Sequence, residues 1–437
     1  MLSSCAALEA IAQAAKSSPQ SPALIEPNGQ TLDYNQLWEQ IEALSRRIEE
    51  AGVEAGERVA ILLPQGMRQV LAITGAIHRH IAIPLQTKTA PAEVEFFMRS
   101  AMAAALITAP GCEAEIEAAL GTGAAILIAR SGQPPTRWEI VRQKSAAKIS
   151  APRSAAILYL VTSATTGSSK LVPLTAKNID AGAITVRDAA QMTAADRYLL
   201  IVPMCHILGL ECVFMQFLVG GAILVTEGFD PTAYLGWLRD LRPTWCSGTP
   251  ALYKASLALL KHAPANGKSS LRVLFSAGAP LHNETRQELE AILGAPIHNV
   301  YGLSETGPIA SEICFAGARV PNSVGRAYGV KIGIVDPAGV FLAPGEEGEI
   351  VARGASIFSG YADNPEANRE AFIDDWFRTG DYGHLDEGEN LFVTGRLKEI
   401  VNRGGEKVAL EEVDAVLASH PAVQEAAGRV EDWRGVP

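Results

Sequence analysis

The sequence predicts an α/β protein with two helix-covered, mainly parallel sheets, then a small β-barrel-like subdomain and a truncated α+β C-terminal lobe. Three observations predict this fold. From about residue 55 to 300, short apolar runs alternate with longer segments of helical spacing. After about residue 320, the chain becomes richer in β-branched residues, glycine and charge. Hydrophobic residues make up 48% and charged residues 19% of the 437 residues, the balance of a globular protein with a large core.

The apolar runs of the first region predict buried strands, because they show no alternation of apolar and polar residues. They lie at residues 58–64, 104–109, 124–129, 155–161, 197–203, 221–228, 244–248 and 271–278. Helical spacing appears at 65–78, 231–242 and 281–294, and residues 1–16 predict a short helix. This alternation of strands and helices is typical of parallel sheets covered on both faces.

The second region predicts a small antiparallel or barrel-like unit from residues 323–336, 345–354 and 389–396, which have turns between them. Residues 410–430 predict one helix and the start of a strand. The proline, serine and basic content of residues 130–154 predicts a crossing between subdomains. We therefore expect a large domain at 1–397, with subdomains 1–150, 151–320 and 321–397.

Composition excludes several classes of function. The net charge of −11 argues against a nucleic-acid partner. The six cysteines are scattered and form no CxxC pair, which favours reduced thiols in a cytoplasmic protein over a disulfide framework or a zinc site. Residues 206–225 are long and apolar enough to raise the question of a membrane span. Glu211, Gln216 and the pair Gly220-Gly221 instead favour a buried helix that runs into a buried strand.

A hydroxyl-rich loop, TSATTGSSK, follows the predicted strand at 155–161. A helical segment with Thr175 as its N-cap follows the loop, and a strand–loop–helix unit of this kind favours phosphate binding. The loop is not a Walker loop, because Ser163 replaces the first glycine and Leu171 replaces the final Ser or Thr. A phosphate cradle and an ordinary turn both stay open on this evidence. The candidate phosphate ligands are Thr162, Ser163, Thr165, Thr166, Gly167 and Lys170.

A second candidate site is the segment IHNVYGLSETGP, residues 297–308, which carries Asn299 and Gly302 among other polar and glycine residues. Glu305 offers oxygen ligands that suit Mg²⁺. Thr306 offers a hydroxyl for a phosphate oxygen, and Tyr301 offers a ring that can stack on a base. The alternative is a glycine-rich loop with a solvated glutamate.

A third candidate site is residues 376–408. Asp381 can accept hydrogen bonds from both hydroxyls of a ribose. Arg396 can reach a phosphate or the same ribose. Gly404 and Gly405 suit a tight turn or the close approach of a ligand. Taken singly, a hairpin turn, a surface ion pair and a loop also explain these residues.

The order of these segments resembles the AMP-forming adenylating superfamily, which contains acyl- and aryl-CoA synthetases, carrier-loading adenylation domains and firefly luciferase. Residues 24–37, PMCHILGL at 203–210 and SAGAPL at 276–281 add to the resemblance, which extends from about residue 20 to the end. Residues 229–253 and 395–421 look most like the oxalate, 4-coumarate and medium-chain acid–CoA ligase branch. The chain departs from the usual family pattern at Ala164, Ser169, Leu171 and Ala176.

The resemblance implies ATP-dependent formation of an acyl-adenylate with release of pyrophosphate, and then transfer of the acyl group to CoA or a phosphopantetheine thiol. It implies that the 162–170 loop holds the leaving phosphates, Thr306 the α-phosphate and Glu305 the Mg²⁺. Adenine is expected at Tyr301, Asn299 and the Gly278 loop, and the ribose at Asp381 and Arg396. His206 is expected near the substrate carboxylate, although a helix-capping histidine is the alternative.

The resemblance also places a hinge at Lys398, about which the C-terminal lobe swings between the two half-reactions. Gly404 and Gly405 would then line the tunnel for pantetheine. Only 39 residues follow Lys398, so the resemblance implies that residues 398–437 are the start of an incomplete C-terminal lid domain, and we expect a poor full cycle.

The leading function is a cytoplasmic carboxylate–CoA ligase with a small-molecule acid as substrate. The first alternative is a loading domain that passes the acyl group to a carrier protein. A nucleotide-binding protein that has lost catalysis is the second, since the 162–170 loop departs from the family pattern. Amino-acid substrates are disfavoured because PMCHILGLECVF offers no aspartate for the amine, although Glu211 could serve instead.

Overall fold

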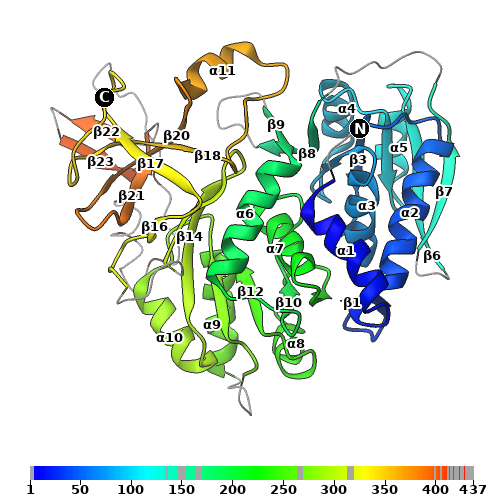
Figure 1. Cartoon of the computed structure of the whole chain (residues 1–437), viewed down its shortest axis with the longest axis horizontal. Coiled ribbons are helices and arrows are strands. Elements are labelled where there is room, and N and C mark those ends of the chain that lie inside the picture. The colour runs from blue at the N-terminus through cyan, green and yellow to red at the C-terminus, as the bar shows by residue number, and fades with distance from the viewer. Residues whose placement is uncertain are drawn as a thin grey trace.

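A computed structural model describes residues 4–132, 136–145, 154–162, 170–262, 269–312, 319–397, 400–403 and 406–410, and the single residues 413, 417, 423 and 428. Its strands form sheets of seven, nine and five strands and one two-stranded hairpin. Figure 1 shows the two larger sheets side by side, with α1, α6 and α7 in the middle of the molecule. The α/β fold with two helix-covered sheets is therefore confirmed.

The seven-stranded sheet has the order β7-β6-β5-β3-β4-β8-β9. Strands β3 to β6 and β8 pair in parallel, while β7 and β9 are antiparallel edge strands. The bounds are β3 Arg58–Leu62, β4 Ile81–Pro84, β5 Ala105–Thr108, β6 Ala125–Ser131, β7 Thr136–Arg142, β8 Ala156–Thr162 and β9 Lys170–Thr175.

The nine-stranded sheet has the order β16-β15-β14-β13-β12-β10-β11-β1-β2. Its central strands are parallel, and β2, β15 and β16 are antiparallel. The bounds are β1 Pro22–Ile25, β2 Thr31–Asp33, β10 Arg197–Leu200, β11 Ala222–Val225, β12 Trp245–Gly248, β13 Val273–Ser276, β14 Ile297–Leu303, β15 Gly307–Ser311 and β16 Arg326–Ala327.

Sheet membership crosses residue 150 in both directions along the chain. Strands β8 and β9 complete the sheet of β3 to β7, while the early strands β1 and β2 join the sheet of β10 to β16. The predicted division at residues 150 and 320 stays a prediction, because sheet membership alone does not define a subdomain boundary.

The described part of the chain contains eleven helices, the last of which packs against two strands of the five-stranded sheet. Their bounds are α1 Ala6–Ser17, α2 Tyr34–Glu50, α3 Met67–Ile77, α4 Pro91–Ser100, α5 Glu113–Leu120, α6 Ala176–Ala189, α7 Ile207–Leu218, α8 Tyr234–Asp240, α9 Pro250–His262, α10 Asn283–Leu293 and α11 Pro365–Ala371. The largest apolar cluster joins buried residues of both sheets with α1, α2, α3, α6 and α7. The two sheets therefore share one hydrophobic core.

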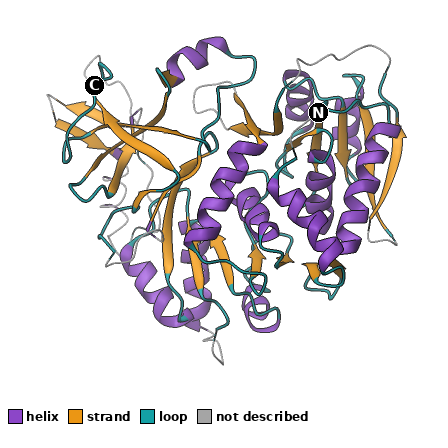
Figure 2. Cartoon of the chain, in the orientation of Figure 1, coloured by secondary structure: helices purple, strands orange, loops and turns teal. Residues whose placement is uncertain are grey.

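Strands at the C-terminal side form a separate, mostly antiparallel unit, which Figure 2 shows as a group of strands with little helix. This unit contains β17 Val330–Val335, β18 Gly348–Gly354, β19 Phe372–Ile373, β20 Trp376–Leu385 and β21 Leu391–Arg396. The small antiparallel sheet that the sequence predicts in this region is confirmed, and the subdomain bounds 321–397 stay a prediction. A hairpin of β22 Ile400–Arg403 and β23 Glu406–Ala409 follows, and most of the predicted lid domain lies outside the described residues.

The segment after the hydroxyl-rich loop corrects one expectation. Thr175 is the N-cap of α6, and its side chain accepts a hydrogen bond from the Asn178 backbone, as predicted. However, Lys170–Thr175 form strand β9, which pairs with β8 in antiparallel register. The loop therefore connects two strands of a hairpin, and the strand–loop–helix interpretation was wrong. Leu171, Val172 and Leu174 are buried in the sheet, which explains why this segment extends instead of entering the helix.

The apolar stretch 206–225 forms α7 and β11, a buried helix that leads to a buried strand. In the residues that the structure describes, no helix has the length and apolar character that a membrane crossing requires.

Candidate active site

A cavity of about 660 Å³ opens between α6, α7 and the ends of the central strands of the nine-stranded sheet. Its lining draws on residues 206–215, 249–252, 275–278 and 300–308. Four residues that sequence reasoning singled out line it together: His206, Gly278, Gly302 and Arg396. They come from four separate segments, so the fold brings them to one place.

His206 stands immediately before α7, as the N-cap residue of that helix. Its side chain makes no capping hydrogen bond, and it lines the cavity instead. Burial lowers the pKa of the imidazole below its ordinary value, so His206 is neutral at neutral pH. A neutral imidazole can donate one hydrogen bond and accept another at the cavity wall.

The β14–β15 hairpin forms the opposite wall of the cavity. Its two strands approach so closely that a side chain on Gly302 would overlap the carbonyl oxygen of Gly307. Thr306 lies in the turn and is fully buried. Its hydroxyl donates to the Gly307 carbonyl at 2.7 Å and accepts from the Leu303 amide at 2.9 Å. The hydroxyl therefore holds the turn together in this state, and a role at a phosphate stays a prediction.

Asp381 and Arg396 face each other across β20 and β21, where they are register partners. The Arg396 Nε atom lies 2.8 Å from Asp381 Oδ1, and the Tyr301 hydroxyl donates to Asp381 Oδ2 at 2.6 Å. Burial and the neighbouring Asp381 raise the pKa of Tyr301 well above its ordinary value, so the phenol keeps its proton. The carboxylate is buried, while about half of the Arg396 side chain is exposed and reaches the cavity.

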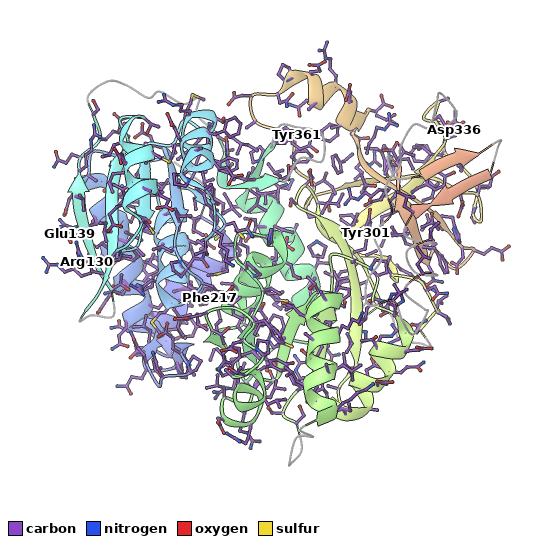
Figure 3. The ribbon with its side chains drawn as sticks, turned by 180° about the vertical axis from the view of Figure 1, so that it is seen from behind. Arg130, Glu139, Phe217, Tyr301, Asp336 and Tyr361 are labelled. Atoms are coloured by element: carbon purple, nitrogen blue, oxygen red, sulfur yellow. The ribbon has the colours of Figure 1, made fainter. Side chains whose placement is uncertain are left out.

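Glu305, Tyr361 and Lys170 form a second polar cluster beside the same hairpin. The Tyr361 hydroxyl donates to Glu305 Oε1 at 2.9 Å, and the Lys170 ammonium lies 4.4 Å from the centre of the Tyr361 ring. Phe358 packs edge-on against Tyr361 and fixes the ring. Figure 3 labels Tyr361 close to α11 and Tyr301 at the junction with the β-rich unit. The hairpin thus has an Asp–Arg–Tyr cluster and a Glu–Tyr–Lys cluster.

The remaining described candidates lie around these two clusters. The backbone N–H of Asn299 donates to Glu312 Oε2 at 2.8 Å, and the backbone carbonyl of Asn299 accepts from the Ser311 hydroxyl at 3.0 Å. The Thr162 hydroxyl donates to the Lys170 carbonyl at 3.3 Å across the ends of β8 and β9. Gly278 has a φ of +90°, a conformation that favours glycine, where the chain turns at the cavity wall.

Seven candidates lie outside the described residues, and their roles stay predictions. They are Ser163, Thr165, Thr166 and Gly167 of the hydroxyl-rich loop, Lys398 at the expected hinge, and Gly404 and Gly405.

Magnesium is compatible with Glu305. The Tyr361 hydroxyl donates a hydrogen bond to one oxygen of the Glu305 carboxylate and so fixes its position. Carboxylate oxygen is a ligand type that Mg²⁺ takes in proteins. In the described part of the chain, no group of three or more His, Cys, Asp or Glu side chains is arranged to hold a metal. An ion here would therefore depend on the phosphates of a nucleotide and on water, which is usual for Mg²⁺.

Sequence reasoning did not single out Tyr361 as a site residue. Tyr361 is 56 positions from Glu305, so only the folded structure reveals their contact. Glu211, which in the sequence argues against a membrane span and could substitute for an absent aspartate, also lines the cavity. Nothing in the spacing of these two residues could have marked them as site residues.

The AMP-binding enzyme family matches residues 11–362 of the chain. The oxalate–CoA ligase of Arabidopsis thaliana is 30% identical over 94% of this chain and 83% of the plant protein. The sulfoacetate–CoA ligase of Cupriavidus necator is 30% identical over 95% of this chain and 83% of its own length. Both are CoA ligases by name, as the resemblance in the sequence predicts.

Solved structures with ATP show the same fold. ATP-bound MatB from Rhodopseudomonas palustris is 26% identical and superposes with a TM-score of 0.84 over 97% of this chain and 85% of that chain. MenE from Bacillus subtilis, in complex with ATP and magnesium, is 25% identical with a TM-score of 0.83 over 95% of this chain and 85% of its own. The family match, the two relatives and this geometry lead to one conclusion: the chain belongs to the AMP-binding enzyme family.

Proposed function

We propose that the cavity beside Asp381 and Arg396 is the adenylation site of this protein, an AMP-forming carboxylate–CoA ligase. One observation carries the assignment. His206, Gly278, Gly302 and Arg396, from four separate segments, line the same cavity of about 660 Å³. A cavity of this size holds a small ligand, and most of its lining is apolar, as an acyl or aryl group requires.

The ribose and the adenine belong at the β-rich side of the cavity. Asp381 accepts hydrogen bonds from donors, and two ribose hydroxyls are donors of the right type. Arg396 holds the carboxylate in place from the cavity side and carries a positive charge toward a phosphate. Gly278, where the chain turns at the cavity wall with a φ of +90°, allows the flat base to approach the backbone.

The phosphates belong at the Glu–Tyr–Lys cluster. Lys170 supplies a positive charge, and Tyr361 holds Glu305 where an Mg²⁺ ion would bind. The ion, when bound, neutralises charge on the phosphates as pyrophosphate leaves. Attack of a carboxylate on the α-phosphorus requires positioning and charge neutralisation more than proton transfer, and these side chains supply both.

The acid belongs in the apolar part of the cavity, next to α7. The neutral imidazole of His206 can donate a hydrogen bond to the substrate carboxylate. CoA is the acceptor that the CoA-ligase relatives support, with a carrier-protein thiol as the alternative. A cytoplasmic location stays a prediction.

Thermal shift with AMP and non-hydrolysable acyl-adenylate mimics tests this function. A ligand at 100 times its dissociation constant stabilises the fold by about 2.7 kcal/mol, a shift of about 1–3 °C for a chain of this size. We expect AMP to shift the transition and at least one mimic to shift it further. Asp381→Asn should weaken AMP binding by about tenfold or more, the effect of one hydrogen bond to a charged group.

Asp375→Asn is the matched control, because Asp375 pairs with Arg353 on an exposed surface. If AMP binds equally to the unchanged protein and to Asp381→Asn, the ribose assignment is wrong. If neither AMP nor any mimic moves the transition, the adenylation site itself is refuted.

A further inference from the structure

We propose that Glu211 selects the acyl group, by accepting a hydrogen bond from a hydroxyl or ammonium group that the substrate carries beyond its reacting carboxylate. This inference rests on the proposed function and names the class of its substrate. It concerns a residue of the cavity that the proposed adenylation chemistry does not use.

Glu211 has three properties that structural carboxylates seldom combine. Its side chain lines the cavity, although the residue is only 8% exposed. Among the described residues, none pairs with this carboxyl by a hydrogen bond or an ion pair. Burial raises its pKa well above the ordinary value, as expected for a carboxyl without a counter-charge. A buried polar group without a partner costs free energy, so a ligand that supplies the partner gains affinity.

The surroundings of Glu211 make room for its carboxyl. Gly182 of α6 faces it, and a side chain there would come within 2.7 Å of Glu211 Oε1. Gly307 of β15 has a φ of +60°, and a side chain at that position would overlap the same oxygen. Glycine on two separate elements therefore lets Oε1 pack closely against α6 and β15. The carboxyl is thus held at the cavity wall by packing, with no hydrogen-bond donor among the described residues.

The charges of the cavity wall indicate which group would be accepted. Besides Glu211, the charged or titratable residues of the described lining are His206, Cys212 and Arg396. Burial keeps His206 neutral, and it raises the pKa of Cys212 to about 12, so that thiol is uncharged as well. Arg396 is paired with Asp381. A second carboxylate or a sulfonate on the substrate would meet Glu211 with no cation at that end of the cavity.

The position along α7 gives the distance scale. His206 precedes the helix and Glu211 lies five residues later, roughly 7.5 Å along the helix axis at 1.5 Å per residue. If His206 contacts the reacting carboxylate, Glu211 contacts a group farther along the acyl chain. The expected substrate is therefore a monocarboxylic acid with a hydroxyl or amine on its chain. Oxalate and sulfoacetate, which name two of the relatives, each carry two acidic groups.

Acyl-adenylate mimics of matched length test the inference by calorimetry. The acyl chains end in methyl, hydroxyl, ammonium or carboxylate, and AMP reports the nucleotide part of the site. We expect a hydroxyl or ammonium end to bind about tenfold more tightly than methyl, as one charge-assisted hydrogen bond predicts. At a pH above the folded pKa of Glu211, where its carboxyl is ionised, a carboxylate end should bind more weakly than methyl.

Two variants separate the sources of the preference. Glu211→Leu should abolish the advantage of both donor ends over methyl. Glu211→Gln should retain a preference for hydroxyl and lose one for ammonium, because the amide has no negative charge. Glu117→Leu, at an exposed position of α5, is the control and should keep the preferences of the unchanged protein.

Two results would overturn the inference while leaving the adenylation site intact. One is that AMP and the methyl mimic bind, but Glu211→Leu leaves the donor-to-methyl affinity ratio unchanged. The other is that the carboxylate end binds best. If AMP and every mimic fail to bind the unchanged protein, the proposed function fails, and this inference fails with it.

Discussion

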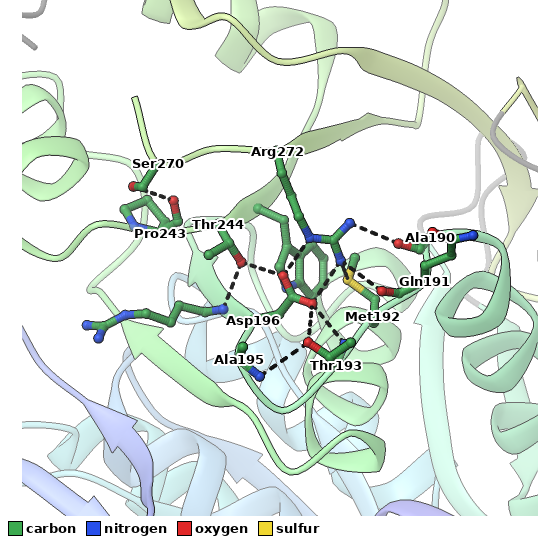
Figure 4. Close-up of polar contacts among 12 residues, drawn as sticks. Ala190, Gln191, Met192, Thr193, Ala195, Asp196, Pro243, Thr244, Ser270 and Arg272 are labelled. Atoms are coloured by element: carbon green, nitrogen blue, oxygen red, sulfur yellow. Dashed lines mark hydrogen bonds and ion pairs between the residues drawn. The ribbon is translucent and has the colours of Figure 1, made fainter. Parts of the chain in front are cut away.

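Asp196 and Glu211 are two acidic residues that are buried to almost the same extent, since they are 4% and 8% exposed. Asp196 receives hydrogen bonds from Thr193, Thr244 and Arg272, at 2.8, 2.8 and 2.6 Å, as Figure 4 shows. Glu211 pairs with none of the described residues and faces the cavity. Equal burial therefore describes two different situations, and the number of fixed protein donors distinguishes them.

The two environments move the two acid pKa values in opposite directions. Burial alone would raise the pKa of Asp196, but Arg272, Thr193 and Thr244 lower it below its ordinary value. Burial raises the pKa of Glu211 and no described donor opposes it. A carboxylate with fixed donors stabilises the fold, whereas a carboxyl without them is available to a ligand.

Of the substitutions that test this comparison, removal of the Asp196 carboxylate should change the free energy of unfolding most. Asp196→Ala leaves Arg272, Thr244 and the Thr193 amide without their acceptor. We expect the free energy of unfolding to fall by about 3 kcal/mol, the lower end for a broken buried pair, because the Arg272 side chain is 38% exposed. Urea unfolding measures the loss, and Asp240→Ala, which breaks the exposed pair with Arg239, is the control. Equal midpoints for both variants would show that the network is not structural.

Glu211→Gln should have a smaller effect that depends on pH. Because the pKa of Glu211 is raised in the folded state, the folded protein holds a proton that the unfolded chain releases above its pKa of about 4.3. The contribution of this proton to the free energy of unfolding is therefore fully present below about pH 4.3 and is lost as pH rises through the folded pKa of Glu211. Glutamine carries no such proton, so the variant should lose this decline.

Urea midpoints at several pH values above 4.5 measure this difference. The Asp196 contribution has the opposite sign, because its pKa is lowered: it is present above about pH 4 and is lost as pH falls below that value. The two windows do not overlap, so the comparison of Glu211→Gln with the unchanged protein isolates one group. Parallel curves above pH 4.5 would mean that Glu211 has a donor or a counter-charge after all.

The sequence predicted the parts of this protein that depend on local pattern. Apolar runs marked the buried strands, and Thr175 marked the start of α6 because a cap is a contact between near neighbours. The pattern failed at Lys170–Thr175, where pairing with β8 makes the segment a strand instead of the lead into a helix. Such pairing is a tertiary effect that short windows of sequence do not contain.

The residues of the candidate site differ in the same way in how well the sequence could predict them. His206, Gly278, Gly302 and Arg396 could be found because they lie in segments whose order resembles a family. Tyr361 could not, because it acts through Glu305, which lies far away in the chain. In the sequence, Glu211 suggests a site residue only as a substitute for an absent aspartate, because its burial without a donor depends on residues far away in the chain. Asp196 and Glu211 also look alike in the sequence, since each is an acid next to an apolar stretch. Only the donors around each side chain separate them.

Gly182→Ala should have the smallest effect, and it probes the space around the Glu211 carboxyl directly. Alanine stabilises a helix by about 0.8–1.0 kcal/mol relative to glycine, but its methyl group at this position would lie 2.7 Å from Glu211 Oε1. We expect the gain and the crowding to offset each other, with a net change within about 1 kcal/mol. In a Glu211→Ala background the contact with Oε1 is gone and only Pro308 Cδ, at 3.3 Å, stays close, so the same substitution should stabilise by most of the helix term. Urea unfolding of the four proteins gives the coupling energy. A coupling energy of zero would place the carboxyl away from Gly182, and the space that the two glycines leave would then have another purpose.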